Sequence, residues 1–395
     1  MKSFYNCMMT ETQANEVLQN AAKSGNVVEL LEALEAGADT NAMNKDCLSS
    51  LMLAARAGHS DCVKQLVAYG AEVNAVDHDG WSSLMHAVNN GHIKCAQLLV
   101  NAGADEHLVD CDGETALMRA AARGYADCVQ MLLALGMSPK VTDFSGADSL
   151  MYAVNKGRAK CVKLLLAHGA DPNSAFEAAI LKGRKSIIKL LLEGGANPNN
   201  GFVGGESIPM AQLLLEYGAD PNVGLARATR VAYVKFLLRH GGDASKGIAC
   251  AAEWGCRSSV KVLLDCGADP SDGLVGAAAG GYLKLVQMLL ERGADPNVGL
   301  AEAAYWAHMP VVHELLWKGA DPNQGLRGAA AGGHAFVVDL MLRKGANPNE
   351  GLAPATREAH MDIVELLISR GASPEQREAQ NDADAAQQKD TFDAA

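Results

Sequence analysis

Residues 164–173 read LLLAHGADPN, and variants of this stretch return along almost the whole chain. Each variant places a glycine after a run of apolar residues, and successive glycines are 33 residues apart at first and 26 or 23 later. The glycines are Gly37, Gly70, Gly103, Gly136, Gly169, Gly195, Gly218, Gly241, Gly267, Gly293, Gly319, Gly345 and Gly371. Self-similarity at a period of about 20–50 residues predicts a stack of thirteen repeats, with no separate globular domains.

The prolines mark the same position in the repeats. Nine of the 12 prolines lie three residues after one of these glycines, as Pro172 follows Gly169. A glycine just past a helix supplies a left-handed cap, and a proline soon afterwards prevents the helix from continuing. Each repeat is therefore expected to end a helix at this place.

Within one repeat the pattern indicates two helices and a loop. A first helix is expected from Ser82, which can cap a segment with apolar residues at helical spacing. Gly91 interrupts this pattern, and a second helix is expected from Ile93. Residues 75–81, AVDHDGW, precede Ser82 and have the turn chemistry of a tight β-hairpin.

These features resemble the ankyrin-repeat family. The 33-residue period, the TPLHxA helix start and the GADxN ending of that family have counterparts here, the helix start in TALMRA at 115–120 and SSLMHA at 82–87. The family's proline is replaced by Ser or Ala, which removes some pre-organisation of the first turn but keeps the capping residue. The resemblance covers about residues 14–373. It implies an all-α solenoid, an ankyrin-repeat array with β-hairpin fingers.

The change of period from 33 to 26 residues corresponds to the loss of the hairpin. Seven residues lie between Asn74 and Ser82, whereas only Val223 and Gly224 separate Asn222 from the next helix core. Fingers are therefore expected only in the N-terminal part. We predict an N-terminal segment (1–13), full repeats (14–173), short repeats of 23–26 residues (174–373) and a disordered acidic tail (374–395).

Two consecutive repeats near residues 201–232 are shorter still. Residues 201–207, GFVGGES, contain three glycines, which disfavour a helix because glycine loses the most backbone entropy. We expect a defect in the stack at this point.

The composition limits the class of function. The net charge of −12 disfavours nucleic acid as a partner, because phosphate binding needs a basic face, and no polybasic segment suggests a membrane surface. No apolar run approaches the roughly 18 residues that cross a bilayer, and residues 1–12 lack a signal-peptide core. The ten cysteines are too dilute for a disulfide scaffold, so we expect a reducing, cytoplasmic setting.

Candidate chemical groups have simpler structural explanations. Four cysteines recur at one repeat position: Cys62, Cys95, Cys128 and Cys161. One thiol per repeat cannot supply the convergent ligands of a zinc site, and repeats stacked about 8–10 Å apart are too distant for disulfides. His59, His92 and His334 follow the inter-helix glycine and are expected to bond turn backbone. We predict no metal, no cofactor and no catalytic residue.

Asn74 leaves two interpretations open. Together with Leu66, Glu72 and Val73 it matches the pattern that an asparagine hydroxylase accepts in ankyrin repeats of animals. The favoured interpretation is that the Asn74 side chain bonds the turn backbone, as its counterparts in other repeats do.

The resemblance implies two partner-binding patches, because ankyrin-type proteins bind through finger tips and the concave face of the first helices. The finger patch is acidic with aromatic anchors and would suit a basic or mixed partner segment: Asp77, His78, Asp79, Trp81, Asp110, Asp112, Glu114, Asp143 and Phe144. The second patch lies just before the inter-helix glycine of the short repeats: Trp254, Trp306 with the adjacent Tyr305, and Glu358. Gly280 and Gly332 share this position, and Gly280, between the two tryptophans, is expected to leave a gap for a partner side chain. The alternative, that each tryptophan ring folds back over its own helix-end loop and only shields backbone, stays open.

We therefore expect a monomeric, non-catalytic scaffold or adaptor that binds a protein partner, with no nucleic acid and no membrane. An effector of an intracellular microbe that binds host proteins would have the same features. An enzyme with catalytic residues embedded in the solenoid would need ionisable groups that converge across repeats, and the sequence offers none.

Overall fold

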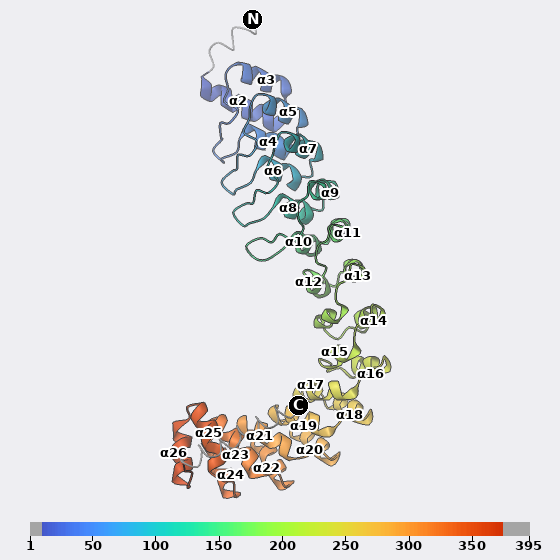
Figure 1. The fold of residues 1–395 in the computed structure, drawn as a ribbon, viewed down its shortest axis with the longest axis vertical. Helices are drawn as coiled ribbons and strands as arrows, with labels where there is room; N and C mark the ends of the chain where they lie inside the picture. Colours follow the sequence, from blue (N-terminus) through green and yellow to red (C-terminus); the bar gives the residue numbers. More distant parts are fainter. Residues whose placement is uncertain (1–9, 374–395) are drawn as a thin grey trace, which may run out of the picture. The chain divides into compact units, whose positions relative to one another are not determined.

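The computed structural model describes residues 10–373. The predicted acidic tail lies outside the described residues, as does most of the predicted N-terminal segment. The chain divides into two compact units, unit 1 up to Gly204 and unit 2 from Gly205. Both units consist of stacked helix pairs (Figure 1).

Unit 1 pairs a first helix with a second helix in each repeat. The first helices are α2 (Glu11–Ser24), α4 (Ser50–Ala57), α6 (Ser83–Asn89), α8 (Ala116–Arg123), α10 (Ser149–Lys156) and α12 (Phe176–Leu181). The second helices are α3 (Val27–Glu35), α5 (Ser60–Ala68), α7 (Ile93–Asn101), α9 (Ala126–Ala134), α11 (Ala159–Ala167) and α13 (Lys185–Glu193). Helix α2 is capped by Thr10, so the helical array starts before residue 14. The 3-10 helix η1 (Pro198–Gly204) takes the place of a first α-helix in the glycine-rich segment.

Unit 2 continues with short repeats. The first helices are α15 (Pro221–Leu225), α17 (Ile248–Glu253) after the 3-10 turn η2 (Ala244–Lys246), α19 (Pro270–Ala279), α21 (Asn297–Tyr305), α23 (Pro322–Ala331) and α25 (Asn349–Arg357). The second helices are α14 (Ile208–Glu216), α16 (Val231–Arg239), α18 (Arg257–Asp265), α20 (Leu283–Glu291), α22 (Met309–Trp317), α24 (Ala335–Arg343) and α26 (Met361–Ser369).

Residues 82–101 show how the sequence builds one repeat. The Ser82 hydroxyl accepts a hydrogen bond from the Met85 N–H over 3.3 Å and so caps α6. Gly91 has a left-handed φ of 76°, which a side chain would disfavour, and the chain turns there before α7 begins at Ile93. Both helix starts agree with those predicted from the sequence.

Four long loops precede first helices of unit 1 where β-hairpins were predicted. We number them loop 1 to loop 4, and each is closed by one isolated antiparallel bridge: Met43 with Ser49, Val76 with Ser82, Val109 with Thr115, and Thr142 with Asp148. In loop 2, the Asp77 carboxylate accepts hydrogen bonds from the N–H groups of Asp79 and Trp81, at 3.0 and 2.8 Å. These donors are then unavailable for a β-ladder, so loops with single bridges replace the predicted hairpins. Among the described residues, no such bridge follows Asp148.

Small side chains allow the first helices of unit 1 to approach closely. Alanines recur at one position along the stack and are fully buried: Ala54, Ala87, Ala120 and Ala153. The four cysteines that recur at another position are also buried, which agrees with their predicted role as small core residues.

The residue after the inter-helix glycine, or after Ala307 or Ala359 where alanine replaces that glycine, connects many repeats to the preceding one. Four histidines at this position place Nε2 within hydrogen-bond distance of a backbone carbonyl: His59 with Lys23, His92 with Arg56, His308 with Ala279, and His360 with Ala331. The prediction that His59 and His92 bond turn backbone is therefore confirmed.

His334 was predicted to behave in the same way, and this is wrong. Its ring forms no hydrogen bond with any described residue, because the preceding repeat carries Ala307, with a φ of 54°, in place of the glycine. A Cβ added to the equivalent Gly281 would lie 2.8 Å from the His308 ring. The Ala307 methyl group thus occupies the space that the His334 ring would need.

Asn74 also connects neighbouring repeats. Its amide oxygen accepts a hydrogen bond from the Asp105 N–H over 2.7 Å, and its amide nitrogen donates to the Gly103 carbonyl over 3.2 Å. Asn297 of unit 2 accepts from the Asp321 N–H in the same way, at 2.7 Å. These contacts support the interpretation that Asn74 bonds turn backbone.

The buried thiols are expected to be unreactive. Burial raises the pKa of Cys95 and of Cys128 to about 11, so little thiolate exists near neutral pH. We expect Cys62, Cys95, Cys128 and Cys161 to react with a disulfide reagent roughly 100-fold more slowly than exposed thiols, because the thiolate is the nucleophile. Mass spectrometry of partly labelled protein measures this, with the exposed Cys47, Cys111 and Cys266 as internal controls. Equal labelling, or about one bound zinc per chain, would contradict the structural role.

Cys47 is expected to strain loop 1. It has a φ of 57°, whereas Gly80, Gly113 and Gly146 occupy the corresponding left-handed positions of the other loops. Because this conformation costs a non-glycine residue about 1 kcal/mol, Cys47→Gly should raise the free energy of unfolding by roughly 0.5–1 kcal/mol. Urea titration compares it with Cys47→Ala, which keeps the strain. If the glycine variant is no more stable than the alanine variant, loop 1 is not strained here.

Candidate binding surfaces

Each loop of unit 1 starts with an Asn or Asp side chain that organises the loop backbone. Oδ1 of Asp110 accepts hydrogen bonds from the N–H groups of Asp112 and Glu114, at 3.0 and 2.8 Å. Asp77 in loop 2 and Asn44 in loop 1 bond two loop N–H groups in the same manner. These hydrogen bonds hold the loop tips in a fixed conformation.

In loops 2, 3 and 4, the other carboxylate oxygen of this aspartate, Oδ2, contacts a side chain from the first helix of the same repeat. His86 places Nε2 2.9 Å from Asp77, Arg119 forms an ion pair with Asp110, and the Tyr152 hydroxyl lies 2.7 Å from Asp143. His86, Arg119 and Tyr152 occupy the same position of α6, α8 and α10, so one pattern repeats along unit 1.

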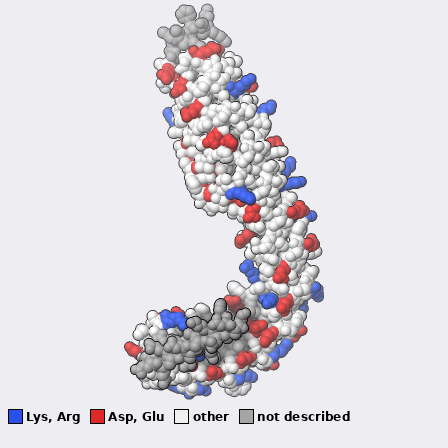
Figure 2. Space-filling view, in the orientation of Figure 1, with Lys and Arg blue, Asp and Glu red and all other residues white. Residues whose placement is uncertain are grey.

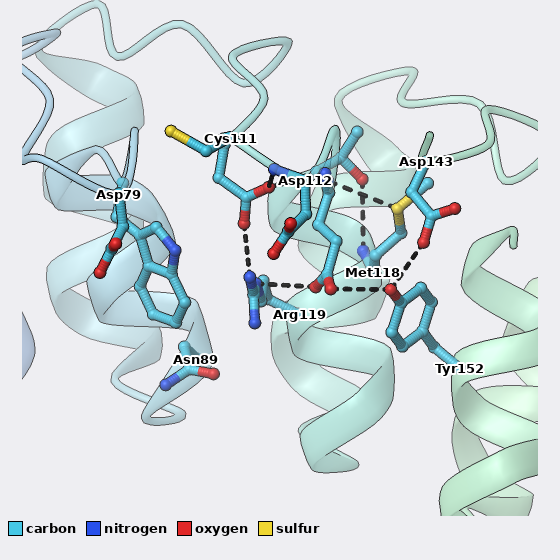
Figure 3. Close-up of polar contacts among 12 residues, drawn as sticks. Asp79, Asn89, Cys111, Asp112, Met118, Arg119, Asp143 and Tyr152 are labelled. Carbon is cyan, nitrogen blue, oxygen red and sulfur yellow. Dashed lines mark hydrogen bonds and ion pairs between the residues drawn. The ribbon is translucent and has the colours of Figure 1, made fainter. Parts of the chain in front are cut away.

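Two of these side chains also connect neighbouring loops (Figure 3). The Arg119 guanidinium lies 4.3 Å from the centroid of the Trp81 ring in loop 2, a cation–π contact. The Tyr152 hydroxyl lies 2.7 Å from a carboxylate oxygen of Glu114 in loop 3. Loops 2, 3 and 4 are therefore joined by one polar network.

The polar network of loops 2 to 4 affects the protonation of Asp143 and His86. Burial alone would raise the pKa of Asp143, but hydrogen bonds from Tyr152 and from Ser145 and Ala147 lower it below its usual value. Burial lowers the pKa of His86 more than its contact with Asp77 raises it, so His86 is neutral at neutral pH. Asp143 thus stays ionised, and His86 adds no positive charge to the loops.

Asp77, Asp110 and Asp143 were predicted to contact a partner, but in the structure their side chains face the loops and first helices. The Asp77 side chain is only 5% exposed, and Asp110 and Asp143 are buried. Their oxygen atoms bond the loops and first helices, because an unpaired buried carboxylate would be unfavourable. Glu114 is likewise engaged by Arg119. The predicted residues that remain accessible form what we call the loop surface: His78, Asp79, Trp81, Asp112 and Phe144.

The loop surface combines acidic and aromatic side chains. Phe144 is 80% exposed at the tip of loop 4, whereas Trp81 is partly buried between Arg119 and the His86 ring. In unit 1, Figure 2 shows Asp and Glu mainly on the side of the loops and most Lys and Arg on the side of the second helices. This side of unit 1 is thus acidic.

Unit 2 exposes aromatic and apolar side chains at the turns between paired helices. Trp254 follows the last residue of α17 and is 67% exposed, and Trp306 follows the last residue of α21 and is 56% exposed. The Tyr305 ring packs edge-on against Trp306, with centroids 5.1 Å apart. Glu358 is exposed at the same position of α25. The predicted residues of unit 2 are therefore accessible, and all four lie at first-helix ends.

Three exposed residues of the same turns were missed by the sequence analysis. Phe336 near the start of α24 is 73% exposed, Met361 opens α26, and Tyr282 precedes α20. All three lie one to three residues after the inter-helix glycine or its counterpart Ala359, and this is a signal that could have identified them. We call the combined set the turn edge of unit 2: Trp254, Tyr282, Tyr305, Trp306, Phe336, Glu358 and Met361.

The gap predicted at Gly280 does not exist, and Gly332 leaves none either. A Cβ added to Gly280 would overlap the Tyr282 ring, and one added to Gly332 would overlap the backbone carbonyl of Tyr305. Gly280 makes room for the Tyr282 ring of its own repeat, and Gly332 lets the preceding repeat approach at Tyr305, so neither glycine opens a pocket. A partner would therefore contact the aromatic rings from outside.

In the described part of unit 1 the position of Trp254 and Trp306 carries no aromatic residue, although Tyr125, which is 38% exposed, occupies the position of Tyr282. The position of Trp254 and Trp306 is occupied there by Ala57, Asn90, Arg123 and Lys156. An exposed aromatic at this position is thus not a requirement of the repeat, which needs only a residue that can precede the glycine.

Two further properties bear on function. Asp77, His78 and Asp79 place possible metal-ligand atoms within 4.8 Å of one another, but the Asp77 oxygens already bond loop N–H groups and His86. The described helices include none that combines the length and apolarity required to span a bilayer.

Comparisons with known proteins were made for sequence and structure. The family described as ankyrin repeats in three copies matches residues 18–110, 102–176 and 150–202, and a single ankyrin repeat matches residues 274–299. No curated protein matches the chain. One similar solved structure is the crystal structure of the human ASB11 ankyrin repeat domain, with 27% sequence identity and a TM-score of 0.47 over 51% of this chain and 97% of that chain.

Proposed function

This chain belongs to the ankyrin-repeat family, whose repeats generally serve as protein–protein interaction modules, and we propose that it is a non-catalytic scaffold that binds a protein partner mainly through the turn edge of unit 2. The proposal places the partner-binding role on Trp254, Trp306 and their exposed neighbours. It assigns no reaction to the chain.

The single observation that supports this proposal is the row of exposed aromatic side chains along the turn edge. Trp254, Trp306 and Phe336 are all more than half exposed, and they lie at the turns of nearby repeats. Exposed apolar side chains in contiguous patches are unfavourable in water and often mark interaction sites. Tryptophan and tyrosine are among the residues most enriched in binding hot spots.

The charge of the loop surface supports a protein partner with basic groups. Asp79 and Asp112 are exposed at equivalent positions of neighbouring loops, and Phe144 gives an aromatic contact beside them. Because complementary charge accelerates encounter and fixes orientation, we propose that the loop surface receives a basic or mixed-charge part of the partner.

Site-specific photo-crosslinking tests the position of the contact. A benzophenone amino acid placed at Trp306 or Phe336 is expected to link the chain to one common protein in a lysate of its source cells, because both positions lie on the turn edge. The matched control is Trp317, which is 75% exposed but ends the second helix α22. Mass spectrometry identifies the adducts. If Trp317 links to the same protein as efficiently as Phe336, or the two edge positions yield no common protein, the proposal is wrong.

A further inference from the structure

The space between loops 1 and 2 is open, whereas the spaces between later loops are bridged. Arg119 spans from Asp110 in loop 3 to Trp81 in loop 2, and Tyr152 spans from loop 4 to Glu114 in loop 3. The equivalent residue of α6 is His86, which contacts Asp77 and Trp81 of its own loop. Within the described part of the chain, His86 has no hydrogen-bond partner in loop 1, because its side chain is shorter than that of Arg119.

A hollow of about 500 Å³ lies at this unbridged position. Its walls include Asp46 and Leu48 of loop 1, Asp79 and Trp81 of loop 2, and Arg56 and Arg123 at the ends of α4 and α8. The volume falls within the range of about 300–1,000 Å³ that is usual for ligand sites, so the hollow can hold more than one side chain.

The loop wall of the hollow is suited to a cationic side chain. Asp46 and Asp79 occupy the same position of successive loops, and both are exposed. One repeat further along, Arg119 shows how a guanidinium fits such a space, since it contacts the Trp81 ring and pairs with Asp110 and Glu114. A partner arginine that enters the hollow would meet the carboxylates of Asp46 and Asp79 and the part of the Trp81 ring that Arg119 and His86 leave accessible.

The helix wall of the hollow is suited to a carboxylate. The Arg56 side chain forms no hydrogen bond or ion pair with any residue from 10 to 373. Arg123 uses only Nε, which donates to the Asn89 amide oxygen over 3.0 Å. The other N–H groups of both guanidiniums are therefore available, and arginine binds carboxylates through paired N–H groups.

We infer that the hollow receives a mixed-charge segment of a partner protein, with an arginine side chain against Asp46, Asp79 and Trp81 and a nearby acidic side chain against Arg56 and Arg123. This inference rests on the proposed function, because it names the chemistry of the segment that the loop surface of unit 1 recognises. The two walls carry opposite charges, so a purely acidic or purely basic segment would satisfy only one of them.

The probe is the blocked tripeptide acetyl-Arg-Ala-Glu-amide, added to the full chain. Binding is followed by the indole N–H resonance of Trp81, which Trp81→Phe assigns among the four tryptophans of the sequence. The tripeptide is expected to shift this resonance saturably and to bind at least about tenfold more tightly than acetyl-Arg-amide or acetyl-Glu-amide, because it engages both walls. An unmoved resonance overturns the inference, as does equal affinity for either single residue.

Three variants test the walls separately. The double variant Asp46→Asn/Asp79→Asn should bind the tripeptide about tenfold or more weakly than the wild-type chain does. The double variant Arg56→Gln/Arg123→Gln should bind the tripeptide no more tightly than acetyl-Arg-amide. His86→Arg should place a guanidinium in the hollow, as Arg119 does between loops 2 and 3, and so prevent the tripeptide from binding. The matched control is Asp61→Asn, which makes the same substitution at an exposed carboxylate of α5 outside the hollow.

The outcomes separate this inference from the proposed function. If the tripeptide binds Asp46→Asn/Asp79→Asn as tightly as the wild-type chain, the inference is overturned even when a partner is crosslinked through Phe336. If the tripeptide binds as expected but no partner is crosslinked through the turn edge, the inference about the hollow is supported. The proposal that the turn edge of unit 2 is the main contact is then overturned.

Discussion

Gly328→Ala should destabilise unit 2 by about 3 kcal/mol, the largest stability change that we expect from a single methyl group in this chain. Gly328 lies in α23 directly against α21, and an added Cβ would overlap the backbone carbonyl of Ala301. Backbone atoms of a packed helix cannot rotate away as a side chain can, so the two helices must separate. Hydrogen exchange should show faster opening of α21 and α23.

Gly299→Ala is the matched control, because it is the same substitution inside α21. A Cβ there would lie 3.0–3.2 Å from the side chains of Leu274 and Ala278, of which the leucine can shift. The gain in helix propensity of about 0.8–1 kcal/mol should offset most of the crowding. Equal stability of the two variants would contradict the view that α21 and α23 pack backbone against backbone at Gly328.

Replacing both Trp254→Ala and Trp306→Ala should weaken partner binding by more than about 2 kcal/mol, or roughly 30-fold in Kd. Both rings are more than half exposed in the free chain, so their removal leaves the buried core intact. The free energy of unfolding should therefore change by no more than about 0.5 kcal/mol per site, as is usual for surface positions. Trp317→Ala, at an exposed ring with Lys318 4.6 Å from its centroid, is the control and should bind normally.

Local signals in the sequence were sufficient to predict the helices. Ser82, Gly91 and the repeated glycine after the second helix act through their own backbone conformation, which depends little on distant residues. The loss of seven residues after Asn173 also predicted where the loops stop. The loops themselves differ from the predicted hairpins, because Asp77 and its counterparts bond the N–H groups that a β-ladder would use.

The candidate site was only partly predictable. Sequence spacing shows that Trp254, Gly280 and Trp306 share a position, but it does not show that the Tyr282 ring covers Gly280. Acidic residues at a loop tip look alike in sequence, yet Asp79 is exposed while Asp77 faces the loop backbone and His86. These outcomes depend on how side chains pack in the folded repeats, which periodicity alone does not specify.

The hollow between loops 1 and 2 could not be predicted for the same reason. It exists because His86 stands where the next repeats have Arg119 and Tyr152, and the reach of each side chain across the loops becomes apparent only in the folded stack.

The most direct test of the proposed function is the affinity of the crosslinked partner, once purified, for the wild-type chain and for the Trp254→Ala/Trp306→Ala variant, measured by calorimetry. We predict a Kd at least about 30-fold higher for the double variant, with Trp317→Ala within about twofold of wild type and all three chains equally stable. An unchanged Kd for the double variant, or a loss of binding that only accompanies a lower melting temperature, would contradict the proposal that the turn edge of unit 2 is the main contact.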